Sequence, residues 1–194
     1  FTAYEKLPQL SSHLHLPIQS GSDRILAAMK RGYTVLEYKS VIRKLKKARP
    51  GMTFSSDFIV GFPGETEEEF MKTIDIIKEI EFDHSYSFIY SKRPGTPAAA
   101  LEDHTTNIEK KERLDFLQAT INTLSKNRSK SIVGDKVEIL VEGISSKYEN
   151  MVTGRTTNNK MISVDGGKNL IGELINVQIT EINNKSLKGE ILIT

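Results

Sequence analysis

The sequence predicts an α/β domain followed by a small all-β domain, and two observations support this division. Up to about residue 130, strand-like apolar runs alternate with helical patterns, whereas beyond it only short β-branched runs occur between Gly, Asn and Asp. We therefore expect one domain over residues 1–130 and a second over 131–194. With 194 residues, of which 38% are hydrophobic, the chain is long enough to bury a core without disulfides or metals.

The first domain reads as a strand followed by a helix, three times over. Strands are expected at 13–18, 52–60 and 84–90, and the longer helices at 35–48, from 66 onward and at 107–128. Thr66 and Glu69 match a capping box, which marks a helix start. Strands joined through helices run parallel, so we expect a parallel sheet with covering helices. In the helix over 35–48, the expected core stripe is Leu36, Val41, Ile42 and Leu45.

The second domain contains five short strand-like runs, at 136–141, 151–157, 161–164, 174–182 and 187–193. This density of short strands is typical of a small closed barrel of the oligonucleotide-binding (OB) kind. Asp165, Gly166 and Gly167 predict a tight hairpin between two of the strands.

The composition excludes several classes of function. The chain has no Cys, which rules out disulfides, thiolate zinc sites, a Cys nucleophile and iron–sulfur clusters held by cysteines of this segment. No apolar run approaches the roughly 20 residues of a membrane helix. The net charge of +2 is too small to indicate a nucleic-acid partner by itself.

Polar residues follow each expected strand of the first domain. Gln19 and Ser20 follow the first strand, Asp57 lies near the end of the second, and 91–93 follow the third. In parallel α/β folds the functional face lies where strands lead into helices, so these residues could hold a ligand. The alternative is that such loops are polar because they face water. Gly61 and Gly64 would also let the backbone approach a flat ligand such as an adenine.

Two further patterns leave alternatives open. His13 and His15 share one strand face and, with Asp57 and His84, could ligate a divalent metal in a barrel hydrolase, or simply be hydrogen-bonded within the fold. The second pattern is a polar and basic group on an expected hairpin of the barrel: Arg155, Asn158, Asn159 and Lys160. These side chains could contact the phosphates of a nucleic acid.

Five motifs, in order and spacing, resemble the radical S-adenosylmethionine (SAM) methylthiotransferases. They are Leu-His-Leu-Pro-Ile-Gln-Ser-Gly-Ser at 14–22, Met-Lys-Arg-Gly-Tyr-Thr at 29–34, Asp-Phe-Ile-Val-Gly-Phe-Pro-Gly-Glu-Thr at 57–66, Tyr-Ser-Lys-Arg-Pro-Gly-Thr-Pro-Ala at 90–98 and Gly-Arg-Thr-Thr-Asn-Asn-Lys at 154–160. The last motif is similar to the family's TRAM domain. The resemblance covers essentially the whole chain.

This resemblance implies a fold and a set of cofactors. The fold would be the second half of a partial parallel (β/α) barrel of the radical SAM kind, followed by an OB-like TRAM barrel. The cofactors would be SAM and two [4Fe-4S] clusters, whose cysteines we expect in an upstream half of the same polypeptide. The segment alone should then be inactive, with no catalytic residue and no metal ligand of its own.

The resemblance also implies site residues. For SAM these are Gln19, Ser20, Arg31, Asp57, Val60 and Gly61. For the substrate and its RNA they are Arg93, Thr96, Arg155, Asn159 and Lys160.

The expected partner is a tRNA anticodon stem-loop, with a cytoplasmic, monomeric parent enzyme that does not bind membranes. The loop at 93–98 is most similar to members that convert N6-isopentenyl-adenosine beside the anticodon to its 2-methylthio form. The alternatives are a sister enzyme acting on a ribosomal-protein aspartate or another tRNA adenosine, a stand-alone RNA-binding module and the metal hydrolase.

Overall fold

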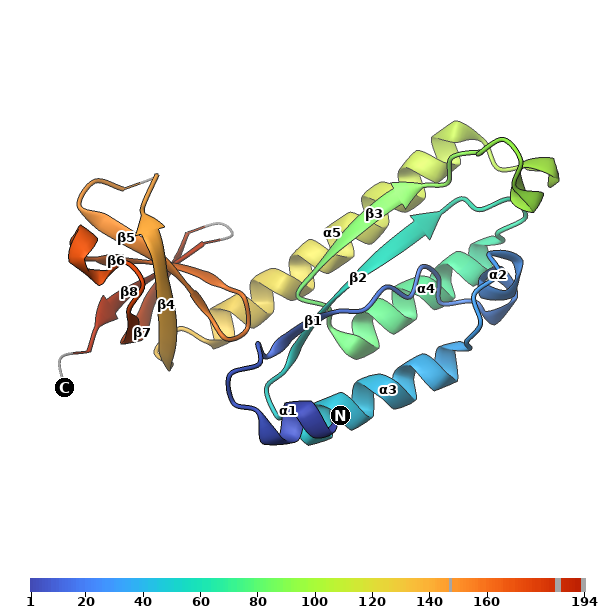
Figure 1. The fold of residues 1–194 in the computed structure, drawn as a ribbon. Helices are drawn as coiled ribbons and strands as arrows, with labels where there is room; N and C mark the ends of the chain where they lie inside the picture. Colours follow the sequence, from blue (N-terminus) through green and yellow to red (C-terminus); the bar gives the residue numbers. More distant parts are fainter. Residues whose placement is uncertain (147, 184–185, 193–194) are drawn as a thin grey trace. The chain divides into compact units, whose positions relative to one another are not determined.

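The computed structural model describes residues 1–146, 148–183 and 186–192 (Figure 1). They divide into two units: the first comprises Phe1–Thr2 and Leu14–Ser125, and the second Ala3–His13 and Lys126–Thr194. The assignment of 1–130 and 131–194 to two domains stays a prediction.

Three strands form the sheet of the first unit, in the order β1 (His13–His15), β2 (Thr53–Val60) and β3 (His84–Ile89). β2 and β3 pair in parallel, and Gln19, beyond β1, pairs in parallel with Phe58. These pairings confirm the expected parallel sheet. One sheet face is buried through Phe54, Phe58 and Val60, while the other bears Tyr86 and Phe88, which are 57% and 56% exposed.

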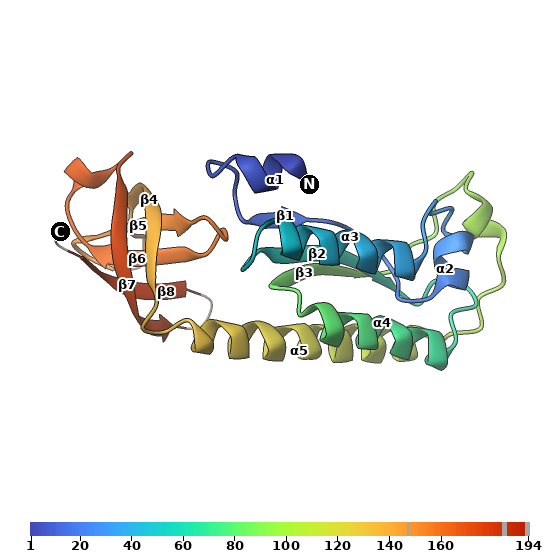
Figure 2. The same ribbon diagram turned by 90° about the horizontal axis from the view of Figure 1, so that it is seen from below.

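The longer helices of this unit are α3 (Val35–Ala48), α4 (Glu67–Ile80) and α5 (Asn107–Ser131), and a shorter one is α2 (Asp23–Ala28). α4 and α5 lie on the same side of the sheet (Figure 2). The capping box of Thr66 and Glu69 at the start of α4 is confirmed. The sequence did not indicate helix α1 (Thr2–Lys6) or the 3₁₀ turn η1 (Pro97–Ala100).

The expected core stripe of α3 was wrong at its first position. Leu36 is 68% exposed, and the fully buried side chains are Tyr38, Ile42 and Leu45. These three are spaced by four and three residues, so they share one helix face, whereas Leu36 lies two residues before Tyr38 on nearly the opposite side. The buried Tyr38 also donates a hydrogen bond to the carbonyl of Leu16, 2.7 Å away.

The second unit contains a closed five-stranded barrel, as expected. Its strands are β4 (Lys136–Ile144), β5 (Met151–Thr156), β6 (Met161–Asp165), β7 (Leu174–Asn183) and β8 (Ser186–Ile191), in the order β4-β5-β6-β8-β7. Residue 193, the expected end of the last strand, lies outside the described residues. Buried aliphatic side chains such as Ile139, Val152, Ile162 and Val177 fill the barrel.

The hairpin expected at Gly166 and Gly167 was wrong. β6 pairs with β5 and in parallel with β8, while β7 pairs with β4 and β8, so β6 and β7 are not neighbours. The 3₁₀ turn η2 (Lys168–Leu170) follows the two glycines instead. A Cβ atom on Gly166 would lie 2.6 Å from Cδ1 of Leu170, so the Leu170 side chain packs close to this glycine.

None of the helices that the described residues form is long and apolar enough to cross a membrane.

Candidate functional site

The first strand-to-helix junction, residues 19–22, is held by backbone hydrogen bonds to β2 and by contacts with α4. Gln19 has φ 76° and is buried, and its N–H donates to the Asp57 carbonyl, 2.9 Å away. Ser20 is completely buried, and its hydroxyl accepts the N–H of Ser22 at 3.2 Å. The side chain of Ser20 therefore supports the loop, and contact of Gln19 or Ser20 with SAM stays a prediction.

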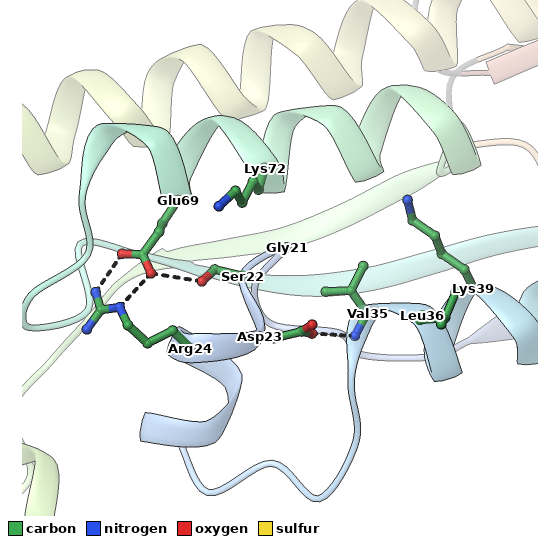
Figure 3. Close-up of a pocket in the computed structure, with 9 residues that line it drawn as sticks. All are labelled: Gly21, Ser22, Asp23, Arg24, Val35, Leu36, Lys39, Glu69 and Lys72. Atoms are coloured by element: carbon green, nitrogen blue, oxygen red, sulfur yellow. Dashed lines mark hydrogen bonds and ion pairs between the residues drawn. The ribbon is translucent and has the colours of Figure 1, made fainter.

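Glu69 connects α4 to the start of α2 (Figure 3). Its carboxylate accepts hydrogen bonds from the Ser22 hydroxyl, 3.0 Å away, and from the Arg24 guanidinium, at 2.6 and 2.5 Å. The hydrogen bonds from Arg24 lower the pKa of the Glu69 carboxyl to about 2, with help from the Thr66 N–H and Ser22. Next to this pair, Gly21 donates its N–H to the Thr73 hydroxyl at 2.8 Å.

The second junction, from Val60 to Thr66, contains the expected adenine-facing backbone. Val60 is completely buried, backbone included, and Gly61 is buried as well, so contact of either residue with SAM stays a prediction. Gly61 has φ 66°, a left-handed conformation that favours glycine, and its N–H donates to Oε2 of Glu65 at 2.8 Å. Arg24 also donates to the Gly64 carbonyl, so the two junctions are joined directly.

A polar cluster lies on the sheet face that α4 and α5 leave uncovered. His15 contacts Ser55 through Nδ1, at 2.9 Å, and Asp57 through Nε2, at 3.3 Å. Asp57 is opposite Tyr86 in the sheet, and the ring of Tyr86 meets that of His15 edge-on at 6.1 Å. The Asp57 side chain stays 28% exposed, so it remains accessible to a ligand.

The other expected residues of the first unit lie on loops. Arg31 is exposed after α2. Arg93 and Thr96 are exposed after β3, and the Thr96 hydroxyl donates to the Arg93 carbonyl at 2.8 Å, which closes a turn. Their roles toward SAM or a substrate stay predictions.

On the barrel, the structure brings the expected RNA-facing residues together. They lie at the tip of the β5–β6 hairpin, where Arg155 donates to Asn159 at 3.0 Å and to Glu142 of β4 at 3.0 Å. Lys160 lies immediately before β6, and its N–H donates to the Thr156 hydroxyl at 3.1 Å.

An open pocket of about 610 Å³ lies between α2, α3 and α4 (Figure 3). It contains three cations, and each is paired: Arg24 with Glu69, Lys39 with Glu79 and Lys72 with Glu68. None of the six residues expected at SAM lines it. The pocket is therefore distinct from the strand-end site.

The metal-hydrolase alternative finds no support in the described part of the chain, where no three His, Asp or Glu side chains are arranged to hold a metal ion. Of the residues that the sequence analysis grouped for this alternative, His15 and Asp57 are in contact. The sequence analysis missed three residues that hold the turn after β2: Glu65, which accepts the Gly61 N–H, and Lys110 and Arg113 of α5, which contact Gly61 and Glu65 respectively. The sequence feature that could have identified Glu65 is its position four residues after Gly61, within reach of the Gly61 N–H.

Two family models match separate parts of the chain. Residues 2–77 match the Radical SAM superfamily, and residues 130–192 match the TRAM domain.

Two curated relatives illustrate the similarity, and each is a tRNA-2-methylthio-N(6)-dimethylallyladenosine synthase. The protein from Xylella fastidiosa (strain 9a5c) is 54% identical over 97% of this chain and 38% of its own length. The protein from Francisella tularensis subsp. novicida (strain U112) is 55% identical over 98% of this chain and 43% of its own length. The chain thus spans about two fifths of the length of these relatives. Over nearly its whole length the chain is therefore similar to a segment of these synthases, and it carries both Radical SAM and TRAM sequence.

Proposed function

We propose that this chain works within an enzyme that adds a methylthio group to N6-isopentenyl-adenosine beside the anticodon of tRNA. The observation that carries the proposal is the 54–55% identity, over 97–98% of the chain, to synthases named for this product. A cytoplasmic, monomeric parent enzyme and a tRNA anticodon stem-loop as its partner are part of the same proposal.

In this proposal the three-stranded sheet is the second half of a radical SAM partial barrel, and its uncovered face looks into the cofactor cavity. The exposed carboxylate of Asp57 fits this role, because it can accept hydrogen bonds from ribose hydroxyls or an amino group. His15 orients that carboxylate. The turn that begins at Gly61 would lie beside the adenine. When bound here, SAM would supply radical chemistry together with a cluster held outside this chain, and the residues of this sheet would bind and orient it.

The iron–sulfur clusters do not fit this chain. It contains no Cys, so none of its side chains can supply the thiolates that such clusters require. We propose that both clusters are held by other parts of the parent protein.

Mass spectrometry of digested tRNA nucleosides tests the activity. The full-length protein, with its clusters reconstituted, is incubated with SAM and tRNA that carries isopentenyl-adenosine. We expect the 2-methylthio nucleoside to form, and an unchanged nucleoside would contradict the proposal.

The same protein tests the proposed SAM site at the strand ends. Asp57→Asn should weaken SAM binding, whereas Asp75→Asn, on the exposed face of α4, should not. Equal affinities for the two variants would remove Asp57 from the site.

A further inference from the structure

The turn that follows β2 is held by two cations of α5, a helix that contributes none of the expected SAM residues. The turn begins at Gly61 and closes with a hydrogen bond from the Glu65 N–H to the Phe62 carbonyl, at 2.9 Å. Its left-handed Gly61 is kept in place by the 2.8 Å bond from its N–H to the Glu65 carboxylate. The conformation of this turn therefore depends on where the Glu65 carboxylate lies.

Arg113 fixes that carboxylate. One guanidinium nitrogen lies 3.1 Å from both the carbonyl and Oε2 of Glu65, and the other lies 3.3 Å from Glu67. The guanidinium also stacks over the ring of Phe70, 5.6 Å from its centroid. The Glu65 side chain is only 1% exposed, so Arg113 is the countercharge that water cannot replace.

Lys110, one helical turn earlier, covers Gly61 itself. A Cβ atom on Gly61 would lie 2.5 Å from Cγ of Lys110, which shows that the lysine stem packs directly on this glycine. The Lys110 ammonium is held at 2.5 Å by Asp103, and both side chains are nearly buried. A capping box of Thr106 and Glu109 fixes the first turn of α5, from which Lys110 follows directly.

We propose that Arg113 and Lys110 are positioning residues, which hold the Gly61–Glu65 turn in the conformation that receives the adenine of SAM. This inference rests on the proposed function and goes beyond it, because neither residue belongs to the motifs that suggested the site. Arg113 acts through Glu65, and Lys110 acts by packing on the backbone. α5 thereby sets the shape of a strand end to which it contributes none of the expected SAM residues.

The test measures SAM affinity by equilibrium dialysis in the full-length protein with its clusters reconstituted. Arg113→Met should weaken binding about tenfold, a difference of about 1.4 kcal/mol, because Glu65 loses its countercharge and releases the Gly61 N–H. In the double variant Glu65→Gln/Arg113→Met, an uncharged amide oxygen can still accept that N–H. The double variant should therefore bind within about twofold of the unsubstituted protein. Lys111→Met, which removes a charge from an exposed position of the same helix, is the matched control and should leave the SAM affinity unchanged.

A second readout separates positioning from general destabilisation. In Arg113→Met, hydrogen exchange of the segment 58–66 should accelerate, while the exchange of α3 stays as it was. Unchanged affinity in Arg113→Met, or a double variant as weak as the single one with native helical circular dichroism, would overturn the inference. If the unsubstituted protein binds no SAM, the proposed function itself fails, and that result is visible without any variant.

Discussion

Arg24 of α2 and Glu69 of α4 form a two-point ion pair, with the guanidinium nitrogens 2.6 and 2.5 Å from the two carboxylate oxygens. Glu69 also accepts the Ser22 hydroxyl and the Thr66 N–H, so one carboxylate joins the starts of two helices. Both helices begin at junctions that carry expected SAM residues. The geometry of the proposed site therefore depends on a charge that is not part of it.

The first prediction concerns acid stability. The pKa of Glu69 in the folded chain, about 2, lies below its ordinary value of 4.5. The ion pair thus stabilises the fold fully above pH 4.5, and this contribution is lost as the pH falls toward 2. Because Arg24 is largely exposed, we expect a loss of about 1–2 kcal/mol in the free energy of unfolding, less than the full shift would give.

Urea titrations that follow the helical circular dichroism at pH 6 and pH 3 measure this loss. Glu69→Gln should be less stable at pH 6 and should lose less stability on acidification. Glu68→Gln, at an exposed position of the same helix, is the control. A pH dependence that is the same in Glu69→Gln and the unsubstituted chain would contradict the assignment.

The second prediction concerns the contact between the first junction and α4. A Cβ atom on Gly21 would lie 2.3 Å from the Lys72 carbonyl oxygen, which is backbone and cannot move aside freely. Gly21→Ala should therefore destabilise the first unit by about 1–3 kcal/mol. Gly32→Ala is the matched control, since nothing lies within 4 Å of its added Cβ. Thermal melts of the two variants should differ clearly, and equal melting temperatures would show that α4 does not press on this loop.

The sequence predicted those features that local chemistry decides. Thr66 and Glu69 are three residues apart and form their capping box without help from the rest of the fold. The parallel sheet and the five-stranded barrel followed from periodicity alone.

The features that depend on residues distant in the chain were missed. Gly166 looks like part of a hairpin turn until the parallel pairing of β6 with β8 is known. Arg113 is 48 residues from Glu65, and a single charged residue in an exposed helix pattern gives no sign of such a partner. Likewise, the burial of Ser20 depends on Thr73 of α4, so its position in a polar loop suggested an accessibility that the fold does not give it.

The third prediction concerns the barrel. A Cβ atom on Gly154 of β5 would lie 2.5 Å from the Leu140 carbonyl oxygen of the paired strand. Gly154→Ala should force β4 and β5 apart and destabilise the barrel by about 1–3 kcal/mol. Gly143→Ala, in β4, has open space at its Cβ and serves as the control. Hydrogen exchange of β5 should accelerate in Gly154→Ala only, and equal protection in the two variants would contradict the close approach.

The last prediction concerns RNA binding by the hairpin tip. Arg155 is held between Glu142 and Asn159, so its guanidinium has a fixed direction and needs little ordering when it meets a phosphate. Arg155→Ala should weaken binding of an anticodon stem-loop oligonucleotide by about 1 kcal/mol and reduce the salt slope of log K by about 1. Lys168→Ala removes an equal charge from the exposed turn η2, at the opposite end of β6, and should leave both quantities unchanged. If the two variants lose affinity equally, the RNA responds to net charge alone, and the hairpin tip is not its binding surface.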